Sequence, residues 1–286
     1  MRILIITGLS GSGKSVALNT LEDEDFYCID NLPVKLLTTF IEQCLDENSQ
    51  HHENIAIGID ARSGQEDIDD LIDIVDKLKS NQQQIEVLFF SAEINTLIKR
   101  FSETRRKHPL TNKDTPLIKA IHLEKDILSQ LAEFADLTID TTKTNVRQLR
   151  GLVKKLVVEN PSTGLTIVLQ SFGFKHGIPN DTDFMFDVRC LPNPYWHANL
   201  RPLSGNDTEV VDYLGQFAEV KDMNDSIVAF LQKWIPLFEE ENRTYLTVSI
   251  GCTGGHHRSV YCINQVAKSL GDKINQTITV RHREFE

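Results

Sequence analysis

The feature that most constrains this chain is a glycine-rich segment close to its N-terminus. Residues 8–15 read GLSGSGKS and match the pattern G-x-x-x-x-G-K-[ST]. The apolar run at residues 3–6 predicts a buried parallel strand before it, and the apolar positions after Lys14 predict a helix behind it. Between a strand and a helix, such glycines let backbone N–H groups face a phosphate. We therefore expect a phosphate-binding loop formed by Gly8, Leu9, Ser10, Gly11, Ser12, Gly13, Lys14 and Ser15.

The motif predicts roles for its own last two residues. Two aspartates elsewhere in the chain are candidates for related roles. Lys14 is expected to pair with the β- and γ-phosphates of ATP or GTP, and the Ser15 hydroxyl to bind Mg²⁺. Asp60 ends an apolar strand at 55–59, where a second Mg²⁺-orienting carboxylate belongs; a strand-end aspartate that caps a turn is the alternative. Asp30 ends another strand and either holds the second substrate of a small-molecule kinase or belongs to a turn.

A dense group of cations occupies residues 99–108. In P-loop kinases such a group forms a lid over the transferred phosphate, and elsewhere it binds an anionic partner. A solvated helix face explains the same pattern without a ligand. The members are Lys99, Arg100, Arg105, Arg106, Lys107 and His108.

Strand and helix patterns alternate through the first half of the chain, which predicts an α/β fold with a mainly parallel, doubly wound sheet. We expect an N-terminal P-loop nucleotide-binding, kinase-like domain over residues 1–158. The segment ENPSTG at 159–164 has the composition of a linker. Beyond it a strand pattern restarts at 165–169, which predicts a second, smaller α/β domain over 164–286. The strands of the first half are expected at 3–6, 26–29, 55–59, 87–90 and 137–139, and its helices at 68–78 and 146–156.

A second glycine-rich turn lies between a predicted strand at 245–250 and a predicted helix at 259–270. Its sequence, CTGGHHRS, has the C-x₅-R-S spacing of tyrosine-phosphatase-type sites, and its glycines and arginine favour an anion. A structural Cys252 is preferred to a nucleophile, because Gly251 stands where those phosphatases carry histidine. The predicted phosphate-ligand residues are Cys252, Thr253, Gly254, Gly255, His256, His257, Arg258 and Ser259.

Bulk properties limit the class of protein. The formal net charge of −11 argues against a surface built for non-specific nucleic-acid binding. The five cysteines lack C-x-x-C spacing, which indicates reduced thiols in a cytoplasmic protein. No apolar stretch approaches the roughly 20 residues of a membrane span, so we expect no membrane association.

Seven segments along the chain together resemble the RapZ/YvcJ family of bacterial nucleotide-binding proteins. The resemblance runs over nearly the whole length. The segments are GLSGSGKSVAL (8–18), FYCIDNLP (26–33), IDARS (59–63), ETRRKHPL (103–110), SFGFKHGIP (171–179), DVRCLPNPYW (187–196) and IGCTGGHHRSV (250–260).

The resemblance implies a regulatory protein that binds ATP and GTP and hydrolyses them slowly. Its nucleotide segments would be residues 8–15 together with Asp60, Ala61, Arg62 and Ser63. In the enterobacterial branch the protein is an adapter that presents a small regulatory RNA to RNase E and senses glucosamine-6-phosphate. The same resemblance places RNA and sugar phosphate on the C-terminal domain and makes the protein a homo-oligomer. We expect RNA to contact His256, His257, Arg281, His282 and Arg283.

This sequence departs from the enterobacterial members in two places. It ends in RHREFE where they carry a lysine-rich tail, and it has Tyr195 where they have histidine. Two other functions remain open: a P-loop small-molecule kinase, which Asp30 and the 99–108 cations favour, and a phosphatase built on Cys252. A stoichiometric phosphorylated product would indicate the kinase, and thiol-dependent release of phosphate would indicate the phosphatase.

Overall fold

The computed structural model describes residues 1–45, 53–59, 65–80, 83–159, 164–241 and 243–285. The chain divides into two compact units, Met1–Glu159 and Asn160–Glu286. Among the described helices, none is long and apolar enough to cross a bilayer.

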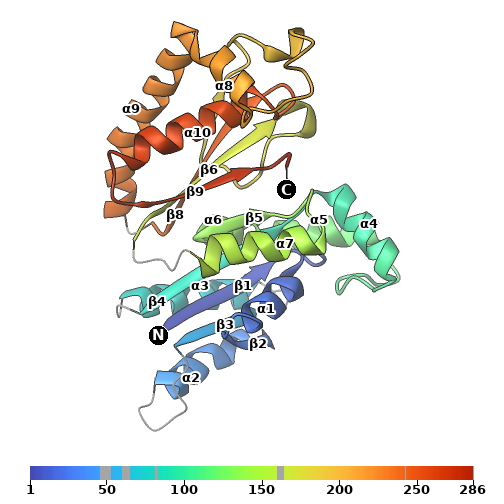
Figure 1. Ribbon diagram of the computed structural model, residues 1–286. Helices are drawn as coiled ribbons and strands as arrows, with labels where there is room; N and C mark the ends of the chain where they lie inside the picture. Colours follow the sequence, from blue (N-terminus) through green and yellow to red (C-terminus); the bar gives the residue numbers. More distant parts are fainter. Residues whose placement is uncertain (46–52, 60–64, 81–82, 160–163, 242, 286) are drawn as a thin grey trace. The chain divides into compact units, whose positions relative to one another are not determined.

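The first unit is built on a five-stranded sheet in the order β2-β3-β1-β4-β5, in which every pairing is parallel (Figure 1). All seven residues of β1 are buried, because β3 and β4 flank this strand and helices cover the sheet. The strands are β1 Arg2–Gly8, β2 Tyr27–Leu32, β3 Asn54–Ile59, β4 Gln84–Ser91 and β5 Leu137–Asp140.

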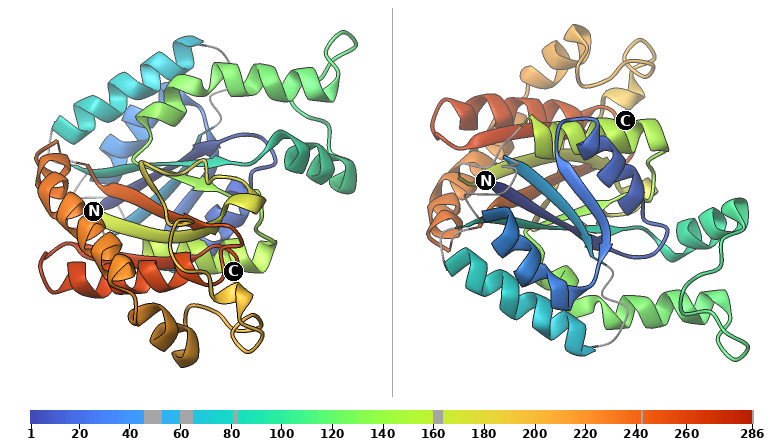
Figure 2. Two further views of the ribbon diagram at one scale, coloured as in Figure 1. Left: turned by 90° about the horizontal axis from the view of Figure 1, so that it is seen from above. Right: turned by 90° about the horizontal axis from the view of Figure 1, so that it is seen from below.

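Helices cover both faces of this sheet, with α1 and α7 on one face and α2, α3 and α6 on the other (Figure 1). Helices α4 and α5, with the segment that joins them, extend beyond the sheet (Figure 2). The bounds are α1 Lys14–Glu22, α2 Val34–Leu45, α3 Gln65–Ser80, α4 Ile94–Thr104, α5 Leu117–Ile127, α6 Ser129–Phe134 and α7 Val146–Val153, which continues as a π-helical turn Lys154–Val158.

The second unit contains a four-stranded parallel sheet in the order β7-β8-β6-β9. Helices α8, α9 and α10 pack on one face of it (Figure 1), where alternate residues of β6 and β8 supply the apolar core. Two 3₁₀ turns, Phe174–His176 and Pro194–Trp196, lie in the connections. The other elements are β6 Thr166–Gly173, β7 Phe184–Asp187, β8 Tyr245–Cys252, β9 Thr277–His282, α8 Thr208–Gly215, α9 Ala218–Glu240 and α10 Arg258–Gly271.

The predicted parallel α/β class is confirmed. The sequence analysis overlooked several elements, of which α9 is the longest at 23 residues. Its buried positions Val220, Asn224, Ile227 and Leu231 follow helical spacing, which the sequence analysis did not use. The strands β7 and β9 were also overlooked, because each is short and only its alternate residues reach the core.

We predict that residues 165–286, expressed alone, fold and melt cooperatively. Each unit has an apolar core and a sheet of its own, which is what independent folding requires. Circular dichroism during heating measures this, with the full chain as reference. A fragment that shows no thermal transition would contradict the prediction.

Candidate functional site

The loop between β1 and α1 has backbone torsions that favour glycine at three positions. Gly8, Gly11 and Gly13 have φ angles of 130°, 83° and 107°. A Cβ atom on Gly8 would lie 2.1 Å from the carbonyl oxygen of Phe90 in β4, and one on Gly13 would lie 2.5 Å from the side chain of Leu149 in α7. The motif glycines are therefore fixed by close packing as well as by torsion.

Lys14 and Ser15 lie in the first turn of α1, at the positive end of the helix. The Lys14 ammonium group donates to the carbonyl oxygens of Gly8 and Leu9, so the side chain folds back over the loop. Ser15 is exposed. The structure thus brings the eight predicted loop residues together on one short turn.

Residues far away in the sequence hold the outer side of this loop. Arg100 in α4 donates to the carbonyl oxygen of Gly11 at 3.0 Å, and the Thr141 hydroxyl donates to that of Ser12 at 2.7 Å. Arg100 also binds Thr141 itself. At the preceding residue, both Ser10 donors reach Glu124 in α5. Sequence analysis missed Glu124 and Thr141, since no local motif marks either residue.

The cations of residues 99–108 do not form a single group. Arg100 is half-buried against the loop, and burial lowers the pKa of its guanidinium although Asp140 and Glu103 oppose that shift. His108 is buried. Lys99 forms an exposed pair with Glu103, and residues 105–107 are exposed. Only part of the cluster is therefore available to an anionic ligand from solvent.

The two predicted aspartates differ in what the structure says of them. Asp30 is exposed in β2, the edge strand. Its carboxylate lies beside Gly58, where an added Cβ would approach it to 2.8 Å. Asp60, Ala61, Arg62 and Ser63 lie outside the described residues.

The second predicted loop connects β8 to α10 and folds tightly around Cys252. The Cys252 thiol is buried, accepts the Gly255 N–H at 3.2 Å, and lies 3.2 Å from the Ser259 hydroxyl. Gly255 has a φ of 78°. A Cβ on Gly173, in β6, would meet the backbone of Gly254 at 2.6 Å, so two backbones approach each other closely here.

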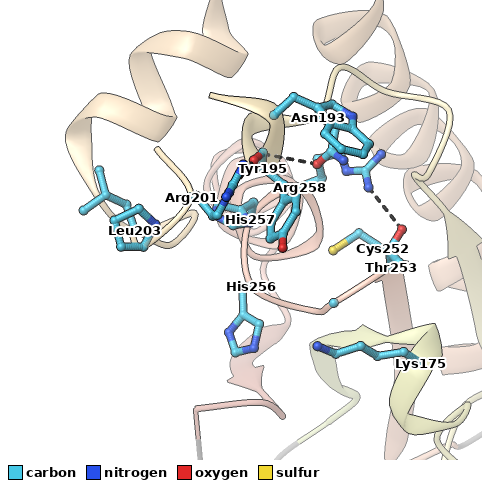
Figure 3. Close-up of a pocket in the computed structure, with 13 residues that line it drawn as sticks. Lys175, Asn193, Tyr195, Arg201, Leu203, Cys252, Thr253, His256, His257 and Arg258 are labelled. Atoms are coloured by element: carbon cyan, nitrogen blue, oxygen red, sulfur yellow. Dashed lines mark hydrogen bonds between the residues drawn. The ribbon is translucent and has the colours of Figure 1, made fainter. Parts of the chain in front are cut away.

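This loop forms one wall of a cavity of about 590 Å³ (Figure 3). Lys175 and Arg201 contribute exposed cations from neighbouring segments. The lining residues that the structure describes include no carboxylate. They are Lys175, Asn193, Tyr195, Trp196, Arg201, Pro202, Leu203, Cys252, Thr253, Gly254, His256, His257 and Arg258.

Arg258 is both a lining residue and a structural one. One of its terminal nitrogens donates to the carbonyl oxygens of Arg189 and Leu191 at 2.7 and 3.0 Å, and the other to the Thr253 hydroxyl at 3.3 Å. Its Nε is buried without a hydrogen-bond partner among the described residues. A buried donor left over in this way is a place where an anion would gain a bond.

The two histidines of the loop contribute less charge than the sequence suggested. Burial lowers the pKa of His256 and of His257, although Glu284 opposes the shift at His256 and hydrogen bonds to backbone oppose it at His257. Both imidazoles are therefore mainly neutral at pH 7. His257 is also bonded to the Leu200 carbonyl oxygen at 3.1 Å.

The Cys252 side chain is buried within its own loop. The Cys252 thiol sits at the base of the loop and completes its hydrogen bonding. This geometry favours the structural role that the sequence analysis preferred.

Two of the RNA contacts expected at the end of the chain are buried in the structure. Arg281 and Arg283 are only 3% and 6% exposed. Arg281 pairs with Asp181 at 3.3 Å, Arg283 donates to the Gly177 carbonyl oxygen, and the ring of His282 lies 3.0 Å from the Ser171 hydroxyl. Successive side chains of a strand point to opposite faces of the sheet, so a charged residue in a strand can be buried. The sequence shows its charge but not its burial.

An exposed aromatic group beside the cavity was also missed. Trp196 is 75% exposed and Tyr195 is 47% exposed. The Arg201 guanidinium lies 4.8 Å from the centre of the Tyr195 ring and donates to the Tyr195 carbonyl oxygen. The tryptophan carried no spacing signal in the sequence, so only the structure identifies it as a surface feature.

Comparison with known proteins covers both units. Residues 1–160 match the family model described as RapZ-like N-terminal domain, and residues 165–286 match the one described as RapZ C-terminal domain. Nucleotide-binding proteins of Thioalkalivibrio sulfidiphilus and Methylococcus capsulatus are 49% and 53% identical to this chain; the matches cover all of this chain and 100% and 96% of theirs. Among solved structures, shikimate kinase from Acinetobacter baumannii in complex with shikimate aligns with a TM-score of 0.38 at 15% identity, over 56% of this chain and 95% of that one. With matches that span both units, the chain belongs to the RapZ family.

Proposed function

We propose that the first unit binds the phosphates of ATP or GTP in the loop of residues 8–15. The observation that carries this proposal is the loop conformation, in which three glycines with positive φ angles stand between a buried strand and the N-terminus of α1. The relatives named nucleotide-binding proteins support it.

The residues present suit a nucleotide with its metal ion. Lys14 would exchange its bonds to Gly8 and Leu9 for bonds to phosphate, and the exposed Ser15 hydroxyl would bind Mg²⁺. The metal, when bound, would neutralise charge on the phosphates during slow hydrolysis. Asp60 remains the proposed second metal-orienting carboxylate.

For the second unit we propose binding of a phosphorylated small molecule in the 590 Å³ cavity. Its walls carry Lys175, Arg201 and Arg258 and, among the described lining residues, no carboxylate. The volume lies within the range of about 300–1,000 Å³ typical of small-molecule sites, so the ligand is larger than a phosphate ion alone. A sugar phosphate such as glucosamine-6-phosphate meets both requirements.

A third part of the proposal is an adapter role in the cytoplasm, in which a homo-oligomer binds a small regulatory RNA and guides it to an RNase E-type nuclease. Trp196, Tyr195 and Arg201 support RNA binding, because exposed rings beside an arginine are typical stacking platforms for unpaired bases. The buried Arg281 and Arg283 are not part of this surface. A small-molecule kinase remains the second candidate, favoured by the exposed Asp30 and the exposed cations at 105–107.

Lys14→Ala should abolish nucleotide binding in a folded protein. The variant loses the only motif side chain that carries a positive charge, and we expect the affinity for ATP and GTP to fall at least tenfold, about 1.4 kcal/mol. Isothermal calorimetry measures it, with the melting midpoint as a check on folding. Lys35→Ala on α2, an exposed lysine, is the matched control. Unchanged affinity in folded Lys14→Ala would refute the assignment, and a stoichiometric phosphorylated product would indicate the kinase.

Lys175→Met should weaken glucosamine-6-phosphate about tenfold or more, since a charge-assisted hydrogen bond contributes roughly 1.5–3 kcal/mol. Lys175 makes a cleaner test than Arg258, which also supports the carbonyl oxygens at 189 and 191. Calorimetry on the full chain gives the affinity, and Lys221→Met on α9 controls for the lost surface charge. If the two variants bind glucosamine-6-phosphate with equal affinity, the proposal that the cavity binds it is wrong.

Trp196→Ala should weaken RNA binding about tenfold, because stacking of one base on an aromatic ring contributes roughly 1–3 kcal/mol. The probe is a labelled oligonucleotide taken from RNA that copurifies with the protein, and fluorescence anisotropy at several salt concentrations gives the affinity. Leu237→Ala, which removes another exposed apolar side chain, is the control. The proposed stacking role of Trp196 would be contradicted if only the Leu237→Ala control lost RNA binding, or if neither variant did.

A further inference from the structure

The carboxylate of Glu124 is buried beside the phosphate loop, and both of its oxygens are hydrogen-bonded. Glu124 lies in α5 and is 0% exposed. One oxygen accepts the Ser10 hydroxyl at 2.6 Å. The other accepts the Ser10 backbone N–H at 2.9 Å and lies 3.1 Å from Nε2 of His108. A buried carboxylate with three such partners is an anchor and not a surface charge.

The contacts of His108 fix which way its ring donates. The Leu110 N–H donates to Nδ1 at 3.2 Å, so Nδ1 carries no proton. The proton of the neutral ring must then be on Nε2, which donates to Glu124. The ring also lies against Phe101, with centroids 5.1 Å apart. Every contact at Glu124 is therefore a donor directed at the carboxylate.

Glu124 is one of three distant residues that are hydrogen-bonded to the loop, with Arg100 and Thr141. We call these hydrogen bonds the ties of the loop. Arg100 and Thr141 hold the carbonyl oxygens of Gly11 and Ser12 in the middle of the loop. Glu124 holds Ser10, which belongs to the first half. A loop with three glycines has many conformations to lose when a ligand orders it, and ties that fix it beforehand reduce that loss.

We propose that Glu124 is a positioning residue for nucleotide binding, which acts through Ser10 to hold the phosphate loop in its binding conformation. This inference rests on the proposed nucleotide site. His108 supports it by orienting the carboxylate from the segment between α4 and α5. Glu124 itself touches the loop and not the proposed ligand.

Glu124→Gln tests this with minimal change of shape. The amide oxygen can still accept the Ser10 N–H and the His108 Nε2–H, but the other position becomes a donor, so the Ser10 hydroxyl must accept where it donated, and the charge that strengthens these hydrogen bonds is lost. We expect ADP affinity, measured by calorimetry, to fall about tenfold in protein that remains folded at the assay temperature. Glu42→Gln removes an exposed carboxylate from α2 and should bind as the wild type does.

Ser10→Ala supplies a second test that keeps the pair of Glu124 and His108, since it removes the hydroxyl bond to Glu124 and leaves the bond from the Ser10 N–H in place. If Glu124 acts through Ser10, the double variant should bind ADP about as weakly as Glu124→Gln alone. Fully additive losses would overturn the inference, as would a folded Glu124→Gln with affinity within twofold of wild type. Should Glu124→Gln fail to fold, Ser10→Ala decides alone: weaker ADP binding at an unchanged melting midpoint supports the tie, and unchanged binding overturns it.

The same measurements separate this inference from the proposed function. If Lys14→Ala loses ADP binding while Glu124→Gln retains it, the nucleotide site stands and the positioning role fails. If wild-type protein binds no nucleotide at all, both fail.

Discussion

The contact between Gly8 and Phe90 constrains the whole phosphate loop. The Phe90 carbonyl oxygen accepts the Leu9 N–H at 3.0 Å and lies 2.1 Å from where a Cβ on Gly8 would be. Only a residue without a side chain lets β1 approach β4 this closely and then leave the sheet with a φ of 130°. The direction in which the chain leaves β1 sets the position of the loop and hence of the first turn of α1.

The two glycine-rich loops of this chain have the same local architecture but differ in how their polar groups are hydrogen-bonded. Each follows a buried parallel strand and precedes a helix. In the second loop the buried Cys252 thiol accepts the Gly255 N–H, so part of its hydrogen-bonding capacity is satisfied within the loop. The Arg258 guanidinium likewise donates to the carbonyl oxygens of Arg189 and Leu191. Exposed charge at this cavity therefore comes from Lys175 and Arg201, which belong to other segments.

Sequence alone predicted the elements whose signals are local. The strands before both loops, the helices after them and the parallel class depend on runs of apolar residues and on glycine spacing, which a reader of the sequence can see. The burial of Arg281 depends on the pairing of β9 with β6, which are more than 100 residues apart in the sequence. Helix α9 has an apolar period that the sequence analysis did not use. The aromatic group at Tyr195 and Trp196 follows from a short 3₁₀ turn without periodicity.

The ties on the phosphate loop show why the rest of a site is difficult to predict. Thr141 and Arg100 are 129 and 89 residues from their partners in the loop, and Glu124 is 114 residues from Ser10. Each is an ordinary residue type in an ordinary helix or turn, and only the packing of α4, α5 and the end of β5 against β1 gives it a role. The motif determines which atoms can bind phosphate, whereas these distant residues determine whether the loop is already arranged to do so. Because an ordered loop and a disordered one can have the same eight residues, the motif alone does not determine nucleotide affinity.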